Sequence, residues 1–257
     1  MQASFWPRRP GRLRPVWSST VVEHHRLRQD LAVVRLIGEA VPFAAGQSVL
    51  VRAPQNDGVL RRYSPALPPS LDGKLEFHVR MVPGGWMSSS IVSESAPGDV
   101  WQISDPVGEM HVDDSGRDVV MVAGGTGLAP FLSLILDVAR RPDQPRVYLF
   151  VGGRSPRDLY ASDMLFLLAQ DLPFLTVIPV VEHLADPPWP DEWYEQCRVD
   201  IGLPQSEMLQ GTLADVLSSH GAFVNHQILV CGSPVMVRST VDRLIDTGTP
   251  KESIQHD

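Results

Sequence analysis

The chain has 257 residues, 43% of them hydrophobic and 20% charged, with a formal net charge of −8. This length and composition are typical of one large globular domain or of two domains of ordinary size. No apolar run approaches the length of a membrane span, and the negative charge gives no reason to expect nucleic acid as a partner.

Metal and disulfide chemistry are not expected either. The only cysteines are Cys197 and Cys231, too few for a four-cysteine iron–sulfur or zinc site. The histidines show no metal-ligand spacing. Because a scaffold disulfide is unusual in a chain of this length, a reducing, cytoplasmic setting is expected.

Residues 1–14 are basic. They carry Arg8, Arg9, Arg12 and Arg14 and no acidic residue, and they lack the apolar core of a secretory signal. We expect them to form a disordered leader or linker rather than a targeting segment.

Residues 15–115 show the pattern of an antiparallel β-barrel. Short β-rich runs are separated by Gly, Pro, Asp and Asn turns, and such punctuation is typical of a barrel. The runs are Val21–Val22, Leu31–Leu36, Gln47–Val51, Lys74–Val82 and Val100–Ile103.

Residues 116–257 follow a polar turn at Asp113–Gly116 and differ in pattern. Apolar runs of parallel-strand type alternate with helical patterns, which predicts a doubly wound α/β domain. A proline-rich stretch, Pro187–Pro190, predicts a surface loop. The predicted strands are Asp118–Ala123, Arg146–Val151, Phe174–Val181 and Gln227–Cys231, and the predicted helices are Pro130–Arg140, Tyr160–Gln170, Gly211–His220 and Pro234–Thr247.

A glycine-rich turn, Gly124–Gly127, follows the first strand of the α/β half directly. The start of the next helix offers free backbone N–H groups and a partial positive charge, which suit a diphosphate. Glycine also lets a ligand approach the backbone closely. The spacing differs from the G-x-G-x-x-G dinucleotide fingerprint, so a plain strand–helix turn is the alternative.

Arg61, Tyr63 and Ser64 form a second candidate group, in the barrel half and just after a predicted strand. An arginine can pair with a diphosphate, a tyrosine ring can stack on a flat heterocycle, and a serine hydroxyl can donate one hydrogen bond. Along a strand, Arg61 and Tyr63 share one face while Ser64 lies on the other. An ordinary edge strand with surface arginines is the alternative.

Two further strand ends carry candidate residues. One strand runs through Pro83–Met87 into a predicted helix start at Ser88, which also suits an anion; a Pro-Gly-Gly turn with a serine cap is the alternative. The last predicted strand ends in Cys231–Gly232, at the edge where open α/β sheets bind ligands. A small buried thiol is the alternative there.

In this order, the motifs Arg-x-Tyr-Ser, Gly-x-x-Ser, Gly-Gly-Thr-Gly-x-x-Pro and Cys-Gly-x-Pro-x-Met resemble the ferredoxin–NADP reductase-like flavoproteins. The resemblance covers residues 17–257, and it includes Phe43–Gln47 at a strand entry and the loop from Gly153 to Tyr160. The likeness is closest to the reductase half of actinobacterial flavohaemoglobin-like proteins.

The resemblance implies an FAD-binding β-barrel followed by an NAD(P)-binding α/β domain, with FAD as cofactor and NADH or NADPH as electron donor. Arg61 would pair with the FAD diphosphate, Tyr63 would stack on the isoalloxazine ring, and Ser64 would hydrogen-bond near flavin N5. The other implied FAD-binding residues are His78, Val79, Arg80, Gly85, Trp86, Met87 and Ser88.

On the nicotinamide side, the resemblance assigns the dinucleotide's diphosphate to Gly125, Thr126 and Gly127. Cys231 would sit near the nicotinamide ring and complete a catalytic set with Tyr63 and Ser64. A loop of the Gly-x-Arg…Asp-Leu-Tyr type is often found with NADH, which we expect here as well. The other implied nucleotide-binding residues are Pro130, Gly153, Arg154, Asp158, Gly232, Pro234 and Met236.

The implied activity is transfer of a hydride from NAD(P)H to FAD, with electrons leaving singly to a haem globin, an oxygenase component or another redox partner. The sequence shows neither the cysteines of a [2Fe–2S] domain nor the length for a globin, so the partner is expected on a separate chain or domain. Family members usually continue past the position of Asp257 to an aromatic residue that covers the flavin. The alternatives are a free-standing reductase of flavin or ferric chelates and a non-catalytic nucleotide-binding regulatory subunit.

Overall fold

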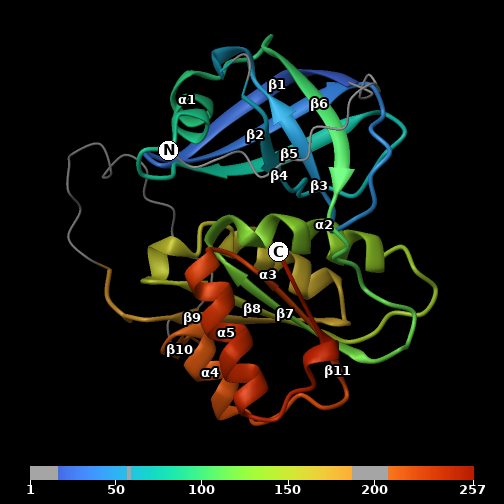
Figure 1. The fold of residues 1–257 in the computed structure, drawn as a ribbon, viewed down its shortest axis with the longest axis vertical. Helices are drawn as coiled ribbons and strands as arrows, with labels where there is room; N and C mark the ends of the chain where they lie inside the picture. The colour runs from blue at the N-terminus through green and yellow to red at the C-terminus, as the bar shows by residue number, and fades with distance from the viewer. Residues whose placement is uncertain (1–16, 57–58, 187–207) are drawn as a thin grey trace, which may run out of the picture.

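The computed structural model describes residues 17–56, 59–186 and 208–257. The expected leader over residues 1–14, the predicted Pro187–Pro190 loop and Cys197 lie outside these ranges. Two domains are stacked along the long axis of the molecule, the N-terminal one built of strands and the C-terminal one of strands and helices (Figure 1). The predicted fold class, an antiparallel barrel followed by a doubly wound α/β domain, is confirmed.

The N-terminal domain is a curled antiparallel sheet of six strands in the order β4-β3-β6-β1-β2-β5. The backbone N–H of Ala66, just beyond β4, donates to the carbonyl oxygen of Glu76 in β5 at 2.8 Å. This bond brings the segment after β4 to the other edge of the sheet, so the curled sheet has the shape of a barrel. The strands are β1 (Trp17–Arg28), β2 (Leu31–Gly38), β3 (Ser48–Arg52), β4 (Arg61–Tyr63), β5 (Lys74–Arg80) and β6 (Val100–Val107).

Strand β5 separates the barrel core from the barrel exterior. Because side chains alternate along a strand, Leu75, Phe77 and Val79 join the barrel's apolar core, while the side chains between them point the other way. Phe77 stacks on Trp101 with ring centroids 5.9 Å apart. Helix α1 (Trp86–Glu94) adds Ile91 and other apolar side chains to this core.

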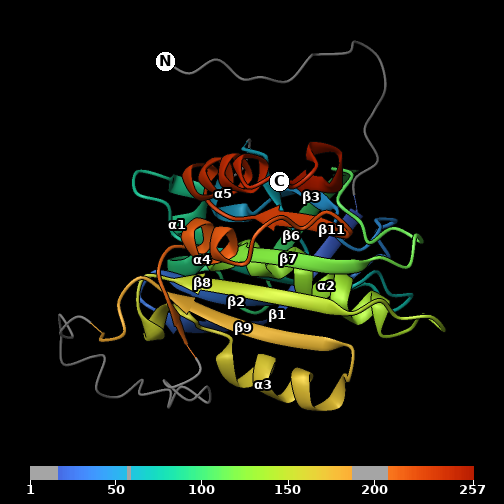
Figure 2. The same cartoon turned by 90° about the horizontal axis from the view of Figure 1, so that it is seen from below.

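The C-terminal domain is a parallel sheet in the order β10-β9-β8-β7-β11-β12, seen from below in Figure 2. In the described part of the chain, no helix is long and apolar enough to cross a membrane. The strands are β7 (Asp118–Gly124), β8 (Val147–Gly153), β9 (Leu175–Val181), β10 (Leu209–Gln210), β11 (His226–Cys231) and β12 (Ile254–His256), and the helices are α2 (Leu128–Val138), α3 (Ser162–Asp171), α4 (Leu213–Ser219) and α5 (Pro234–Asp246), with short 3₁₀ turns at Pro54–Asn56, Gly125–Gly127, Pro156–Asp158 and Lys251–Ser253.

Helices cover both faces of the parallel sheet, which explains why its strands read as continuous apolar runs. Along β7, Val119 and Met121 belong to the cluster that includes α2 and α3, whereas Val120 and Val122 belong to the cluster with α4 and α5. The predicted strands and helices of this domain therefore match the structure within a few residues. The short strands β10 and β12 were not predicted.

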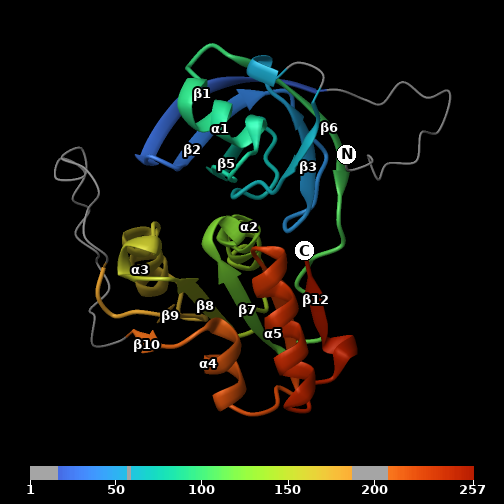
Figure 3. The same ribbon diagram turned by 60° about the vertical axis from the view of Figure 1, so that its left-hand side comes forward.

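Helix α2 lies between the barrel and the parallel sheet (Figure 3). Every residue from Leu128 to Ile135 is buried. Ala45, Ala66 and Met110 of the barrel side share one apolar cluster with this helix. The two domains are therefore held together by a common core rather than by a polar contact alone.

Because Phe131 in the middle of α2 is 0% exposed, its truncation leaves a cavity between the domains. Phe131→Ala is expected to lower the free energy of unfolding by about 3–5 kcal/mol, measured by equilibrium urea unfolding. Leu167→Ala on α3, where the leucine is 59% exposed, is the matched control and is expected to cost less than about 1 kcal/mol. Equal effects of the two substitutions would contradict this account of α2.

Candidate active site between the two domains

The glycine turn after β7 lies beside the end of β11. The two strands are parallel neighbours, with Ala123 opposite Cys231, and β8 lies on the other side of β7. Strand order therefore reverses between β7 and β11, which is where doubly wound sheets bind ligands. The structure brings Gly125–Gly127 and Cys231–Gly232 together at this point.

Close packing requires glycine at position 127, where a Cβ would lie 2.3 Å from the backbone carbonyl oxygen of Cys231. Cβ atoms on Gly124 and Gly232 would lie 2.6 and 2.2 Å from Cε of Met236, at the end of a flexible side chain that can shift. Gly125 has a φ of +55°, which favours glycine. No side chain caps the 3₁₀ turn Gly125–Gly127, and the backbone N–H of Leu128 bonds back to the carbonyl oxygens of Gly125 and Thr126. The N–H groups of Gly125–Gly127, at the start of this helical segment, therefore have no intrahelical partner.

Prolines stand in the first turns of both helices that begin at this edge. Pro130 is buried near the start of α2, and Pro234 opens α5, where Ser233 Oγ accepts a hydrogen bond from the backbone N–H of Met236 at 3.3 Å. Proline is tolerated at these positions because the first N–H groups of a helix have no intrahelical partner. Both prolines therefore support the shape of the edge through the backbone.

Cys231 is a neutral thiol in this structure. It is 8% exposed, and burial, followed by the negative charge of Asp257, raises its pKa to about 12. A thiol with this pKa supplies almost no thiolate at neutral pH, so it is not poised as a nucleophile. The side chain instead offers a small, uncharged surface at the end of β11.

On the barrel side, Arg61 and Tyr63 lie within strand β4 itself, not just after a strand as the sequence suggested. The Tyr63 ring meets Phe77 edge-on, with centroids 6.2 Å apart. Burial raises the pKa of Tyr63 to about 12, so the phenol stays neutral. The side chain of Arg61 is exposed and donates from Nη1 to the carbonyl oxygen of Leu60 at 3.0 Å.

Ser64 is connected to the α/β domain through residues that no sequence motif indicated. Its Oγ lies 2.9 Å from Ser48 Oγ, and Ser48 Oγ donates to Asp257 Oδ2 at 3.1 Å. Arg62 Nη2 forms an ion pair with the other carboxylate oxygen of Asp257. The barrel residues around Ser64 and the segment after β12 therefore meet in one polar contact.

The outward face of β5 docks on the α/β domain through a buried hydrogen-bonded chain. His78, 7% exposed, lies 2.7 Å from the hydroxyl of Tyr160 through Nδ1 and 3.0 Å from Glu76 Oε1 through Nε2. Burial raises the pKa of Tyr160 above its ordinary value, so Tyr160 keeps its proton. An ionised Glu76 only accepts; in neutral His78, Nε2–H therefore donates to Glu76, and Nδ1 accepts from Tyr160.

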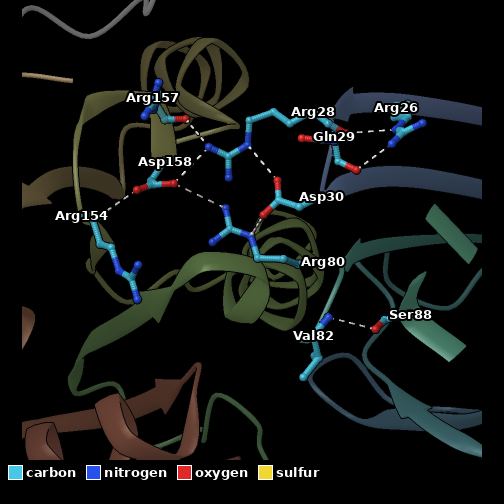
Figure 4. A network of polar contacts seen from close by, with 10 residues as sticks. All are labelled: Arg26, Arg28, Gln29, Asp30, Arg80, Val82, Ser88, Arg154, Arg157 and Asp158. Atoms are coloured by element: carbon cyan, nitrogen blue, oxygen red, sulfur yellow. Dashed lines mark hydrogen bonds and ion pairs between the residues drawn. The ribbon is translucent and has the colours of Figure 1, made fainter. Parts of the chain in front are cut away.

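A cluster of charged residues extends this contact (Figure 4). Arg28 Nη1 donates to Asp158 Oδ1 at 3.0 Å and to the carbonyl oxygen of Arg157 at 2.9 Å. Asp30 lies 3.5 Å from Arg28 Nε and 3.6 Å from Arg80 Nε. Burial opposes ionisation of Asp158, but the hydrogen bond and charge of Arg28 outweigh it and hold the pKa of Asp158 below its ordinary value.

Arg80 carries the main test of whether an anionic diphosphate fits this site. Its Nε and Nη2 have no hydrogen-bond partner among the described residues, although Asp30 lies 3.6 Å from Nε and Asp158 Oδ1 lies 3.8 Å from Nη2. A Cβ on Gly125 would lie 3.4 Å from Arg80 Nη1. A partly buried guanidinium beside a glycine turn that opens a helix suits a diphosphate, so these residues fit one.

The Pro-Gly-Gly turn differs from its prediction. Helix α1 begins at Trp86, not at Ser88, and its N-cap is Gly85. Ser88 Oγ instead accepts a hydrogen bond from the backbone N–H of Val82 at 3.0 Å, which ties the end of the strand segment to the helix. Met87 is buried, whereas Trp86 is 83% exposed.

The loop after β8 holds the remaining candidates. A Cβ on Gly153 would lie 2.8 Å from Cβ of Asp158. The backbone N–H of Arg154 donates to Asp158 Oδ2 at 3.2 Å, and the exposed guanidinium of Arg154 extends away from that carboxylate (Figure 4). Asp158 is therefore engaged within the protein, while Arg154 is accessible.

The buried position of Glu76 predicts a pH dependence of stability. Burial opposes its ionisation, but hydrogen bonds from His78 and Arg35 outweigh that and hold its pKa below the ordinary 4.5. A lowered folded-state pKa contributes stability that is present above the unfolded pKa and is lost as pH falls through the folded one. Glu76→Gln is expected to cost about 1–3 kcal/mol at neutral pH and to flatten the loss of stability in acid.

Equilibrium urea unfolding over a series of pH values measures both effects. Glu94→Gln at the exposed end of α1 is the matched control. The assigned role of Glu76 would be contradicted if Glu76→Gln lost stability in acid as steeply as the wild type. It would also be contradicted if Glu94→Gln flattened the pH dependence of stability as much as Glu76→Gln.

The neutral state of Cys231 predicts slow alkylation. In a Cys197→Ser background, Cys231 is the only cysteine. With iodoacetamide at mildly alkaline pH, the folded protein is expected to react at least about 100-fold more slowly than the urea-unfolded chain, because only the thiolate reacts. Mass spectrometry of timed samples measures the rate, and similar folded and unfolded rates would show that the thiol is not protected.

Two family models match the chain. Residues 18–112 match the oxidoreductase FAD-binding domain, and residues 121–242 match the oxidoreductase NAD-binding domain. The cofactor predictions are thereby confirmed at the level of the domains.

Several relatives of similar sequence are reductase components of oxygenases. The chain is 30% identical over 262 residues to reductase component 1 of terephthalate 1,2-dioxygenase from Comamonas, which covers 100% of this chain and 72% of that protein. It is 33% identical over 208 residues to the phenol 2-monooxygenase reductase component DmpP from Pseudomonas, covering 80% of this chain and 54% of that protein. The chain therefore spans little more than half of the latter relative's length.

Solved structures of other proteins share the fold of this chain. The ferredoxin reductase in carbazole 1,9a-dioxygenase has a TM-score of 0.76 at 26% identity, covering 96% of this chain and 70% of that chain. A flavohaemoglobin from Malassezia yamatoensis has a TM-score of 0.72 at 18% identity, over 94% of this chain and 59% of that one, which shows a shared fold only. The expected special closeness to flavohaemoglobin reductases is thus supported only in part. The chain belongs to the ferredoxin–NADP reductase-like family of FAD- and NAD-binding oxidoreductases.

Proposed function

We propose that this chain reduces bound FAD with NADH and passes the electrons singly to an oxygenase component or another redox partner. The observation that carries the proposal is the meeting of the two nucleotide-binding edges. Ser64, proposed to lie beside the flavin, is linked through Ser48 to Asp257, and the charge of Asp257 also acts on Cys231 at the nicotinamide edge.

Each edge offers what its proposed nucleotide needs. Bound FAD supplies the chemistry of accepting a hydride and releasing electrons one at a time. Tyr63 offers a neutral ring for stacking on a flat heterocycle, and Ser64 offers one hydroxyl. Cys231 is small and uncharged, so a nicotinamide ring can approach the end of β11. The protein's contribution is therefore position and exclusion of water rather than acid–base catalysis.

The two diphosphates are assigned to separate cationic sites. Exposed Arg61 and the start of α1 are proposed for the FAD diphosphate, as the family pattern implies. Gly125–Gly127 are proposed for the diphosphate of the nicotinamide nucleotide. The position of Arg80 Nη1 beside Gly125 supports the assignment of Arg80 to the nicotinamide side, although its motif suggested the FAD side.

We propose NADH as the preferred donor because the loop from Gly153 to Tyr160 resembles the loop type that is often found with NADH. Asp158 does not add to this preference, since it accepts from Arg28 and from the backbone of Arg154 and is not free to select a ribose hydroxyl. Exposed Arg154 offers a cation that a 2′-phosphate can use, which makes measurable activity with NADPH an expected secondary property.

The electron acceptor is proposed from the relatives. Their names describe reductase components of a phenol monooxygenase and a terephthalate dioxygenase, so an oxygenase component, on another chain or on a further domain, is the first candidate. A haem globin is the alternative, on the basis of fold alone. Free flavin and ferric chelates are the small-molecule alternatives.

Anaerobic titration of the FAD-loaded protein tests the proposal. NADH is expected to bleach the flavin absorbance stoichiometrically, and NADPH to do so at higher concentration. Arg80→Gln is expected to raise the Kd of NADH roughly tenfold or more, since charge-assisted hydrogen bonds to a diphosphate are lost. Arg140→Gln, on an exposed arginine beyond the far end of α2, is the matched control and is expected to leave the Kd unchanged.

Three outcomes would count against the proposal. A protein that takes up no FAD would contradict the cofactor assignment. A yellow protein that neither nucleotide reduces would favour a regulatory nucleotide-binding subunit. A reduced protein that passes electrons to free flavin or ferric chelate, but to neither an oxygenase-type [2Fe–2S] protein nor a haem globin, would favour a free-standing reductase.

A further inference from the structure

We propose that Ser48 and Asp257 fix the direction of the Ser64 hydroxyl, so that Ser64 presents only lone pairs to the flavin. Ser48 and Asp257 would then be positioning residues that favour the reduced cofactor over the oxidised one. The inference rests on the proposed function, because it takes the flavin edge to lie against Ser64.

The three groups form a chain that crosses from barrel to α/β domain. Ser48 opens strand β3 and is 1% exposed. Its Oγ lies 2.9 Å from Ser64 Oγ and 3.1 Å from Asp257 Oδ2. Arg62 pairs with the remaining carboxylate oxygen of Asp257, so both oxygens of that carboxylate are engaged.

The direction of the chain follows from the number of hydrogens. An ionised carboxylate can only accept, and each serine hydroxyl has one hydrogen to donate. Ser48 therefore gives its hydrogen to Asp257. The contact between the two serines then requires the hydrogen of Ser64, which leaves Ser64 without a hydrogen for any third group.

This direction discriminates between the two redox forms of a flavin. N5 of oxidised flavin is a hydrogen-bond acceptor, so it finds no donor in Ser64 and faces an oxygen lone pair. N5 of reduced flavin carries a hydrogen, which Ser64 can accept. A buried pairing that suits one form and leaves the other unsatisfied shifts the equilibrium toward the first. The chain is therefore expected to raise the reduction potential of the bound FAD.

Ser48→Ala is the direct test, because it changes no charge. Without Ser48, the Ser64 hydrogen is free to turn toward oxidised N5. The ratio of the Kd of oxidised FAD to that of reduced FAD is expected to fall roughly tenfold, which is a drop of about 30 mV for a two-electron couple. Spectroelectrochemical titration gives the potential, and the oxidised flavin spectrum is expected to shift with the new hydrogen bond.

Ser19→Ala is the matched control. Ser19 is also a barrel serine that is 1% exposed, and its Oγ has no hydrogen-bond partner among the described residues. It is expected to leave the potential unchanged. Ser48→Ala is also made in a Ser64→Ala background, where no further shift is expected because the oriented hydroxyl is absent.

Asp257→Asn supplies a second test that does not depend on the folding of Ser48→Ala. The amide can donate to Ser48 and so reverse the chain, which lowers the potential, whereas loss of a negative charge alone raises it. The shift in reduction potential caused by Asp257→Asn is therefore measured twice, once with Ser64 present and once in a Ser64→Ala background. The first shift minus the second isolates the effect of the reversed hydrogen-bond chain, and this difference is expected to be negative.

An unchanged or higher potential in Ser48→Ala, or a zero or positive difference in the Asp257→Asn cycle, would overturn the inference. The proposed function has a separate failure. A wild-type protein that binds no FAD, or whose FAD no nicotinamide nucleotide reduces, would refute the function, whereas normal reduction with an unshifted potential would refute only the role of Ser48 and Asp257.

Discussion

The burial of α2 between the barrel and the parallel sheet is the constraint on which the rest of the structure depends. From Leu128 to Ile135 the helix has no exposed residue, and its apolar cluster includes side chains of the barrel. Because α2 begins directly after the glycine turn, the packing of α2 against the barrel also places that turn next to the barrel. One apolar contact therefore brings a nucleotide-binding edge of the α/β domain to the other domain.

Polar contacts on both sides of α2 fix the orientation that the apolar core alone leaves free. Tyr160, just before α3, bonds to His78, and Asp257, just after β12, pairs with Arg62. Figure 3 shows α3 and β12 on opposite sides of α2. Hydrophobic contact is not directional, whereas buried hydrogen bonds require defined geometry. The two contacts therefore resist rotation of one domain against the other.

Much of the fold could be predicted because long apolar runs and glycine turns are local signals. The Gly124–Gly127 turn and the end of β11 are recognisable within a few residues, and sheet topology then brings them together. Strands as short as β10 and β12 carry too few residues for a pattern. Ser88 was wrongly predicted as the start of a helix, because a serine that precedes a helix often caps its first turn. In the structure, the Ser88 hydroxyl instead accepts a hydrogen bond from the backbone N–H of Val82.

The polar part of the site could not be predicted, for a different reason. Ser48 and Asp257 are 209 positions apart in sequence, and no motif around either residue indicates that the two are in contact. His78 lies in a recognised motif, but its partner Tyr160 belongs to the other domain. The position of Arg80 could not be predicted for the same reason, because its guanidinium lies beside Gly125 of the other domain. Tertiary structure, not local sequence, decides which of these side chains meet.

The raised pKa of Cys231 affects how well its thiol resists oxidation. Reduced flavins that meet oxygen release hydrogen peroxide, and peroxide oxidises thiolates to sulfenic acid far faster than it oxidises thiols. Cys231 stands at the proposed site of hydride transfer, yet burial and Asp257 raise its pKa to about 12. A sulfur atom placed where such damage is most frequent is therefore kept in the form that resists it.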